Sequence, residues 1–177
     1  GTNAEKIMER FASSKDIKVS LVLVNNPEAG VIKRAEKFNV PVVMFDRNQF
    51  SESDEIVNVL SRNSIDLIVL AGFLWLIPEN MVNAFPHKII NIHPALLPKY
   101  GGKGMYGEKV HQAVVQSGER ESGITIHYVN EKYDDGAIIA QYKCVVEAED
   151  SADAVASKIH ILEHKHFSVV IEQLLIK

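Results

Sequence analysis

The clearest indication of the fold class is the segment Asp66-Leu67-Ile68-Val69-Leu70-Ala71-Gly72. Between the aspartate and the glycine its residues are apolar at odd and even positions alike, which is typical of a strand buried on both faces. Such strands occur in parallel sheets that helices cover on both sides, so we expect this strand to be central. The segment therefore predicts an α/β protein.

Segments with the patterns of strands and helices alternate on both sides of residues 66–72. Apolar and β-branched runs predict further strands at residues 19–24, 40–45, 88–92, 123–129 and 137–146. Helical spacing and terminal signals predict helices at residues 2–11, 30–38, 53–62, 78–85, 108–117 and 151–175. This order predicts βαβ units, so we expect an α/β fold with a mostly parallel central sheet and a single domain over residues 1–177.

The composition restricts the classes of protein to which the chain can belong. Hydrophobic residues make up 46% of the 177 residues and the formal net charge is -4, which suits a compact globular domain. The chain has no tract rich in lysine and arginine, so we expect no nucleic-acid partner. Its longest apolar runs are too short and too interrupted to span a bilayer, so we expect no membrane association. The single cysteine, Cys144, cannot form an internal disulfide, which favours a reducing cytoplasm.

The most informative polar residues lie at the end of the strand predicted at residues 88–92. This stretch reads Ile90-Asn91-Ile92-His93-Pro94 and continues into a segment without clear periodicity as far as residue 107. Asn91 and His93 are two residues apart, so on a strand their side chains lie on the same face. A carboxamide can donate a hydrogen bond to a developing oxyanion, and an imidazole can transfer a proton. Their position at a strand end beside a long loop indicates a catalytic site for acyl transfer.

Four sequence motifs, in the same order, are similar to those of the 10-formyltetrahydrofolate-dependent formyltransferases. The stretch from Asn91 to Tyr100 resembles the N-I-H-P-S-L-L-P-K-Y signature of this family, and residues 71–77 resemble its A-G-F-M-R-I-L segment. Residues 122–129 and 134–139 resemble its two later motifs. The resemblance is close over residues 66–141 and looser elsewhere, and it implies a Rossmann-like three-layer formyltransferase fold.

The order of the motifs and the short chain most resemble family members that act on glycinamide ribonucleotide. The resemblance therefore implies that the formyl group of 10-formyltetrahydrofolate, a co-substrate, is transferred to the amine of this ribonucleotide in purine biosynthesis. No covalent enzyme intermediate is expected. Another folate-dependent formyltransferase, a formyltetrahydrofolate deformylase and a non-catalytic nucleotide- or folate-binding module are the alternative interpretations.

The resemblance also implies a catalytic trio of Asn91, His93 and Asp134. Asn91 would stabilise the formyl oxygen as it becomes negatively charged. Asp134 would pair with His93, raise the pKa of the imidazole and keep it cationic near neutral pH. Asp135 competes for the carboxylate role, but aligning Gly136 with the last glycine of the family motif places Asp134 at the catalytic position.

Residues for the ribonucleotide are implied near both ends of the chain. Gly1-Thr2-Asn3 resembles the end of the family's G-x-G-S-N loop, where backbone N–H groups at a helix N-terminus would hold a phosphate. Glu163 resembles a helix glutamate that the family uses for the ribonucleotide, and His160 falls on the same helical face. The family has a strand before this loop that the present chain lacks, so we expect the natural chain to be longer by roughly 5–6 residues or more.

Folate is expected against four hydrophobic residues and two members of the trio: Leu74, Trp75, Leu76, Ile77, Asn91 and Asp134. Trp75 replaces an arginine that is common at its position, which affects contacts with the glutamate tail of folate rather than the chemistry. His127 lies on a predicted strand and, by analogy with the family, behind the trio.

Several features are left without a role. Residues 101–107 form a longer loop than the corresponding family segment, and His111 falls near the family's loop histidine without matching it. The chain has seven histidines, but no pair has a ligand spacing with a third partner, so we expect no metal. The oligomeric state is open, with a homodimer among the options.

Overall fold

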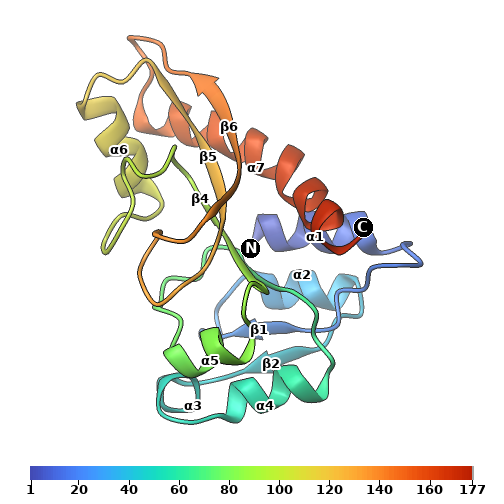
Figure 1. The fold of residues 1–177 in the computed structure, drawn as a ribbon. Coiled ribbons are helices and arrows are strands. Elements are labelled where there is room, and N and C mark those ends of the chain that lie inside the picture. The colour runs from blue at the N-terminus through green and yellow to red at the C-terminus, as the bar shows by residue number, and fades with distance from the viewer. Residues whose placement is uncertain (177) are drawn as a thin grey trace.

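The computed structural model describes residues 1–176, in which helices and strands alternate along most of the chain (Figure 1). In chain order the elements are α1 (Thr2–Phe11), β1 (Val22–Val24), α2 (Val31–Lys37), β2 (Val42–Met44), α3 (Arg47–Ser51), α4 (Glu55–Arg62), β3 (Ile68–Leu70), α5 (Glu79–Ala84), β4 (Ile89–His93), α6 (Glu108–Gln116), β5 (Glu121–Tyr128), β6 (Ile138–Val145) and α7 (Ala152–Leu175). The predicted α/β class is confirmed.

The strands form two hydrogen-bonded groups, β1-β2 and β3-β4-β5-β6. β1 pairs in parallel with β2, and β3 pairs in parallel with β4. The two remaining pairs, β4 with β5 and β5 with β6, are antiparallel. The prediction of a mostly parallel sheet thus holds for β1 to β4. Only residues 129–137 connect β5 to β6, which is too short for the crossover that a parallel pair requires.

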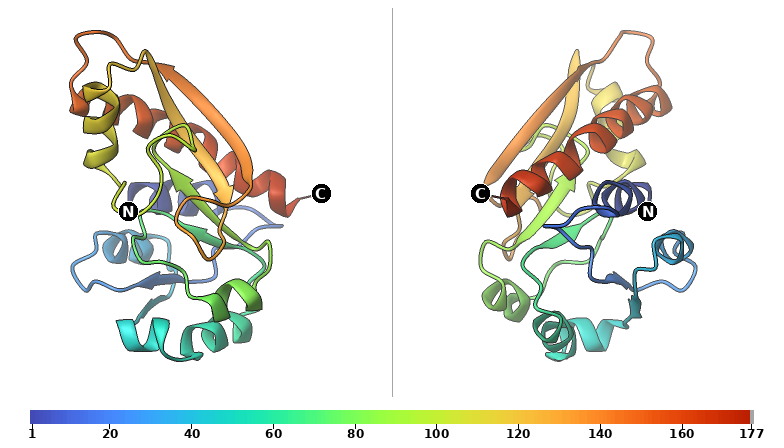
Figure 2. Two further views of the ribbon diagram at one scale, coloured as in Figure 1. Left: turned by 60° about the vertical axis from the view of Figure 1, so that its left-hand side comes forward. Right: turned by 90° about the vertical axis from the view of Figure 1, so that its right-hand side faces the viewer.

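Strand β4 separates two hydrophobic cores. Ile90 and Ile92 pack with residues of α1, α6 and α7 on one face, whereas Ile89 packs with residues of α3, α4 and α5 on the other. Adjacent side chains on a strand point to opposite faces, so β4 must be apolar on both. Figure 2 shows the same layering, with α1 and α7 on one side of the sheet and α3, α4 and α5 on the other. The expected three-layer arrangement is confirmed.

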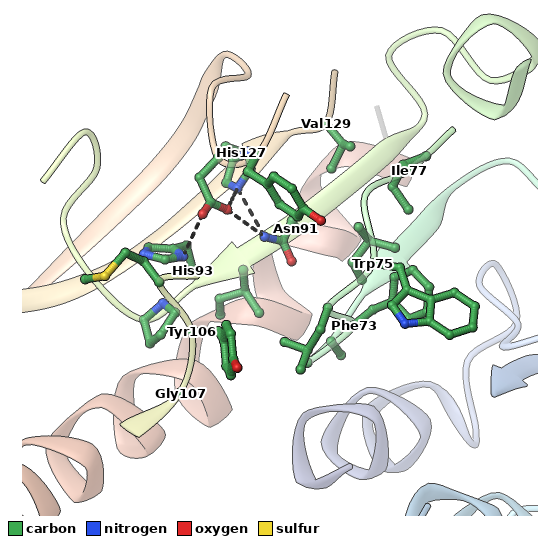
Figure 3. A pocket seen from close by; sticks show the side chains of 18 of the residues that line it. Phe73, Trp75, Ile77, Asn91, His93, Tyr106, Gly107, His127 and Val129 are labelled. Carbon is green, nitrogen blue, oxygen red and sulfur yellow. Dashed lines mark hydrogen bonds and ion pairs between the residues drawn. The ribbon is translucent and has the colours of Figure 1, made fainter. Parts of the chain in front are cut away.

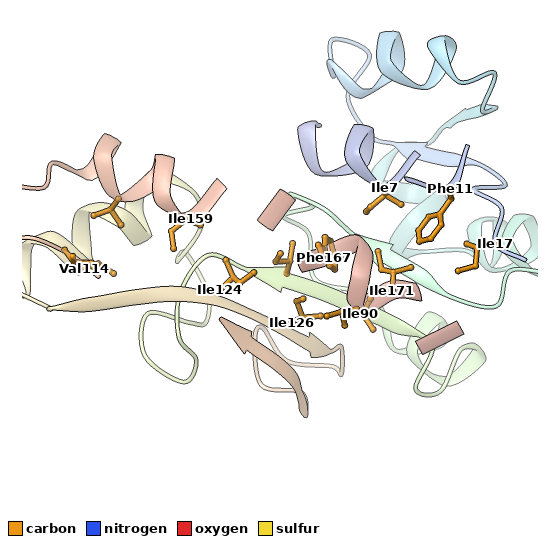
Figure 4. Close-up of a cluster of buried hydrophobic side chains, with 14 residues drawn as sticks. Ile7, Phe11, Ile17, Ile90, Val114, Ile124, Ile126, Ile159, Phe167 and Ile171 are labelled. Carbon is orange, nitrogen blue, oxygen red and sulfur yellow. The ribbon is translucent and has the colours of Figure 1, made fainter. Parts of the chain in front are cut away.

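Helix α7 is the main cover of the antiparallel part of the sheet. Phe167 is 1% exposed and belongs to the same core as Ile124 and Ile126 of β5. Figure 4 shows the side chains of Phe167 and Ile171 directed at those of the strands beneath. Within residues 1–176 no helix is long and apolar enough to cross a membrane.

Two details differ from the sequence predictions. The sequence predicts a central strand at residues 66–72, but β3 is the end strand of its group, and among residues 1–176 no pairing joins it to β1. Helix α3 is not predicted, because five residues are too few to show helical periodicity. Its start is nevertheless marked by a capping box, in which the Asp46 side chain accepts from the Gln49 backbone N–H while the Gln49 side chain accepts from the Asp46 N–H.

The two faces of α7 predict different responses to truncation. We expect Phe167→Ala to lower the free energy of unfolding by about 3–5 kcal/mol, because the large cavity it leaves lies between helix and sheet. Ile161→Ala is the matched control, since that side chain lies on the same helix and is 66% exposed. Urea unfolding of both variants measures the difference. Equal losses in the two variants would contradict the packing described here.

Candidate active site

A cavity of about 530 Å³ lies beyond the carboxyl ends of β3 and β4 (Figure 3). All site residues assigned from the sequence line it: Gly1, Thr2, Asn3, Leu74, Trp75, Leu76, Ile77, Asn91, His93, His127, Asp134, His160 and Glu163. These residues come from opposite ends of the chain and from six separate segments. Their common location is an observation, whereas the role of each remains a prediction.

Asn91 and His127 are held opposite each other by strand pairing. Asn91 of β4 is the register partner of His127 of β5. Nδ1 of His127 lies 2.8 Å from the carbonyl oxygen of Tyr128, so this nitrogen carries the proton. Nε2 of His127 lies 3.2 Å from Nδ2 of Asn91. His127 therefore fixes the orientation of the Asn91 carboxamide.

His93 is a buried imidazole at the end of β4. Its Nε2 lies 2.7 Å from the carbonyl oxygen of Tyr100, to which it donates a hydrogen bond. Its Nδ1 lies 3.4 Å from Oδ2 of Asp134. The side chains of His93 and Asp134 are only 4% and 11% exposed, so solvent screens their interaction weakly.

Asp134 connects the two imidazoles. Its Oδ1 lies 3.6 Å from Nε2 of His127 and 3.5 Å from Nδ2 of Asn91, while Oδ2 also accepts from the backbone N–H of Gly102 at 3.0 Å. The residue has a positive φ of 53°, which is unusual outside glycine. Two residues further along the turn, Gly136 leaves no space for a side chain, because a Cβ there would meet the carbonyl oxygen of Tyr128.

Asp135 points to a different environment. Its side chain is 56% exposed and pairs at 3.9 Å with Lys132 on the surface. The structure thus brings Asp134 to the imidazoles and leaves its neighbour in solvent, which agrees with the motif alignment.

Burial and charge oppose each other at His93. Burial lowers the pKa of His93 and outweighs the nearby carboxylate of Asp134, which raises it. The expectation that Asp134 keeps this imidazole cationic near neutral pH is therefore wrong, because the desolvation of the ring was not visible in the sequence. Burial would also raise the pKa of Asp134, but His127, His93 and the Gly102 N–H together hold it below its ordinary value. The pair is a neutral imidazole facing an ionised carboxylate.

A second polar group lines the cavity where α1, α6 and α7 meet. Glu163 is 6% exposed, and its Oε2 accepts from Nδ2 of Asn3 at 3.0 Å. The same oxygen lies 2.9 Å from Nδ1 of His160. The N-terminal residues of α1 also line this part of the cavity, where backbone N–H groups and the helix dipole favour an anion.

The apolar part of the wall includes two aromatic residues, Phe73 and Trp75. Trp75 and Phe73 pack with Phe45 and Phe50, with ring centroids 5.2–6.1 Å apart across the group. The guanidinium carbon of Arg47 lies 5.0 Å from the centre of the Trp75 ring. The guanidinium of Arg47 therefore lies beside Trp75, although residue 75 itself is uncharged.

Comparison with known proteins assigns this arrangement to a family. Residues 1–171 match the family described as formyl transferase. The chain belongs to the formyl transferase family. A chloroplastic phosphoribosylglycinamide formyltransferase of Arabidopsis thaliana is 44% identical over 177 residues, which cover 97% of this chain and 61% of the relative. The phosphoribosylglycinamide formyltransferase of Bacillus subtilis is 37% identical over 180 residues, covering 99% of this chain and 90% of the relative.

Solved structures agree with the family assignment. The crystal structure of phosphoribosylglycinamide formyltransferase from Bacillus halodurans is similar to this formyl transferase with a TM-score of 0.88 and 33% identity, covering 100% of this chain and 91% of that one. The chain does not span every relative to the same extent. It is 41% identical to a chloroplastic phosphoribosylglycinamide formyltransferase from Vigna unguiculata, of which it covers 51%. The chain thus spans about half to three fifths of the plant relatives that it matches.

Sequence reasoning missed part of the cavity wall of this formyl transferase. Residues 102–107 line it, and Gly102, Gly104 and Gly107 all have positive φ. The glycine-rich composition of this segment was a usable signal, because a long loop beside a strand end is usually functional. His111, which the sequence places only near the family's loop histidine, also lines the cavity. Arg47 lies beside Trp75 and carried no sequence signal, because its position depends on helix α3. Within residues 1–176 no group of three or more histidine, cysteine, aspartate or glutamate side chains could hold a metal ion.

The opposition of burial and charge at His93 predicts the effect of removing the carboxylate. We expect Asp134→Asn to lower the pKa of His93 further, because burial then acts without the compensating charge. Proton NMR titration of the imidazole measures this, with the exposed Asp135→Asn as the control that leaves the pKa unchanged.

The lowered pKa of His93 also makes the free energy of unfolding depend on pH. Because the folded-state pKa of His93 lies below the unfolded value of about 6.5, the unfolded chain binds the proton more readily, and stability falls as the pH drops through this value. The free energy of unfolding should therefore decrease more between about pH 7 and pH 5.5 in Asp134→Asn than in the wild type. A His93 pKa that stays constant or rises in this variant would contradict the geometry.

Proposed function

We propose that the chain transfers the formyl group of 10-formyltetrahydrofolate to the amine of glycinamide ribonucleotide. The observation that carries this proposal is the convergence of a carboxamide, an imidazole and a carboxylate, from Asn91, His93 and Asp134, on one cavity. The names of the relatives support the acceptor, because high-coverage relatives of bacterial origin are described as phosphoribosylglycinamide formyltransferases. The donor is the one that the resemblance of the sequence motifs implies.

The first chemical requirement is to stabilise the formyl oxygen. When the amine adds to the formyl carbon, this oxygen becomes negatively charged and needs a hydrogen-bond donor. Nδ2 of Asn91 has two hydrogens, one directed to Nε2 of His127 and the other weakly to Oδ1 of Asp134 at 3.5 Å. The hydrogen directed to Asp134 is the one available for the formyl oxygen, since the other fixes the amide.

The second requirement is proton transfer. A bond forms between the amine nitrogen and the formyl carbon, and the bond between that carbon and the folate nitrogen breaks. The amine must lose a proton and the leaving nitrogen must gain one. The neutral imidazole of His93 can accept a proton, and the ionised Asp134 stabilises the imidazolium that results. Neither residue needs to form a covalent bond to the substrate.

Different parts of the cavity wall suit the ribonucleotide and the folate. We assign the phosphate to the backbone at Gly1, Thr2 and Asn3, where α1 begins, and the rest of the ribonucleotide to the neighbourhood of Glu163 and His160. The folate ring is assigned to the apolar wall at residues 74–77. Arg47 beside Trp75 supplies a cation for the carboxylates of the folate tail, in place of the arginine that the family often has at position 75.

The alternatives differ in what accepts the formyl group. A deformylase uses water, another formyltransferase uses a different amine, and a binding module transfers nothing. Formyl transfer measured in parallel with glycinamide ribonucleotide, with water alone and with charged tRNA separates these cases. Turnover with the ribonucleotide at least tenfold faster than hydrolysis is the outcome that supports our proposal, about 1.4 kcal/mol of discrimination.

The proposed compartment is the cytoplasm, supported by the single cysteine, Cys144, which forms no disulfide. Two plant relatives are described as chloroplastic. A homodimer and the absence of a nucleic-acid partner stay predictions from the sequence.

The assigned role of Asn91 gives the central test. We expect Asn91→Ala to reduce kcat by about 10²–10³, the usual effect of removing one donor to an oxyanion. Steady-state kinetics with both substrates measures it, and Asn58→Ala on the exposed face of α4 is the matched control. If Asn91→Ala kept more than about a tenth of the wild-type kcat, oxyanion stabilisation by this amide would be excluded.

A further inference from the structure

The contact between His93 and the backbone of Tyr100 determines which nitrogen of the neutral imidazole can accept a proton. A carbonyl oxygen only accepts hydrogen bonds, so Nε2 of His93, 2.7 Å from the Tyr100 oxygen, carries the hydrogen. A neutral imidazole has one N–H, so Nδ1 has none and lies 3.4 Å from Oδ2 of Asp134. The nitrogen that can accept a proton is therefore the one beside the carboxylate.

Asp134 by itself favours the opposite tautomer. An ionised carboxylate attracts the single ring proton to the nitrogen nearest to it, and that nitrogen is Nδ1. An imidazole with its hydrogen on Nδ1 cannot accept a second proton at that atom. The carbonyl of Tyr100 opposes this attraction, because it binds the hydrogen on Nε2. The availability of Nδ1 thus depends on how firmly this carbonyl is held.

The local backbone gives the Tyr100 carbonyl little support. Tyr100 has a φ of 57°, a conformation that residues with a Cβ rarely adopt, and the two residues after it are the flexible Gly101 and Gly102. The side chain supplies what the backbone lacks. Its ring packs against the core that contains Ile124 and Ile126, and its hydroxyl donates to Oε1 of Glu119 at 3.0 Å.

The end of α6 holds Glu119 at this position. The N–H of Gly118 donates to the carbonyl of Val115 at 3.0 Å, and the N–H of Glu119 donates to that of Val114 at 3.3 Å. With Gly118 at a φ of 64°, these two bonds form the Schellman motif that ends many helices. The carboxylate is therefore attached to a rigid helix end, and hydrogen bonds from Lys99 and Tyr100 lower the pKa of Glu119 and keep it ionised.

We propose that Glu119 is a positioning residue for proton transfer: by holding the hydroxyl of Tyr100, it keeps the Tyr100 carbonyl on Nε2 of His93 and leaves Nδ1 free to accept a proton. Within residues 1–176 the cavity wall does not include Glu119, so it acts through Tyr100 rather than on a substrate. The effect on the tautomer is independent of the substrate, whereas the effect on turnover rests on the proposed function.

The tautomer can be measured directly by NMR of protein with ¹⁵N-labelled histidine rings, at about pH 8, where a histidine with a lowered pKa is neutral. The signals of His93 are identified by their loss in His93→Gln. We expect the ratio of the Nε2–H to the Nδ1–H tautomer to fall about fivefold in Glu119→Ala, because the hydrogen bond that holds Tyr100 is lost. Tyr100→Phe should cause the same fall, since it removes the other partner of that bond.

Three further variants serve as controls. Glu119→Gln should keep the ratio within about twofold of the wild type, because its amide oxygen still accepts from the Tyr100 hydroxyl. Lys99→Ala removes the second partner of Glu119, at 2.8 Å, and leaves the contact with Tyr100, so we expect no change in the ratio. Glu121→Ala is the matched surface control, since this glutamate is 55% exposed and pairs with Lys143.

Kinetics and stability separate positioning from a structural role. In Glu119→Ala we expect kcat to fall about fivefold, while the KM values for both substrates change less than about twofold. Glu119→Gln should recover most of this kcat. A lowered melting temperature of Glu119→Ala with an unchanged ratio of tautomers would make Glu119 purely structural and overturn the inference.

The other outcomes are equally decisive. A fall of the ratio in Glu119→Ala that Tyr100→Phe does not reproduce would exclude the route through Tyr100, and an equal fall in Lys99→Ala would attribute the effect to charge; each overturns the inference. A wild-type His93 that carries its hydrogen mainly on Nδ1 also overturns it. If the variants change the ratio as expected but the wild type does not formylate glycinamide ribonucleotide, the proposed function fails and the role of Glu119 stands.

Discussion

The double burial of strand β4 is the constraint on which the rest of the structure depends. Ile89 faces one core while Ile90 and Ile92 face the other, so a shift of the strand by one residue would turn the polar Asn91 and His93 into the core that Ile90 and Ile92 now fill. This fixed register places Asn91 opposite His127 and ends the strand at His93. The polar residues of the site therefore need no network of their own to hold the backbone, because apolar packing on both faces already does so.

Within the site, desolvation affects the pKa of His93 more strongly than the neighbouring charge does. His93 lies beside a carboxylate that would favour its cationic form, yet burial shifts its pKa in the other direction. Asp134 remains ionised because several donors share its two oxygens, among them the N–H of Gly102 from the glycine-rich loop. A neutral base next to a permanent negative charge is the arrangement that accepts a proton and then stabilises the cation formed.

The sequence predicts much of this molecule, and its failures have physical reasons. The apolar strands, the helix α7 and the motif at Asn91 and His93 are local patterns, so the fold class and the membership of the cavity follow from them. The short helix α3 is too short for periodicity, and the end position of β3 depends on long-range pairing. The charge state of His93 depends on how much water surrounds it, and its tautomer depends on where the loop after β4 places the carbonyl of Tyr100. Both properties arise only from tertiary packing.

The hydrogen bonds of Asn91 have a consequence for the choice of substrate. The amide group of Asn91 already has partners within the protein, so in the proposed reaction a formyl oxygen must displace the carboxylate of Asp134 before it receives a hydrogen bond. The energy for this exchange comes from parts of the two substrates that do not react, held by distant regions of the wall. If the chain catalyses the proposed reaction, shortened substrates will react slowly even when saturating, and amines will be discriminated by the rest of the molecule that carries them.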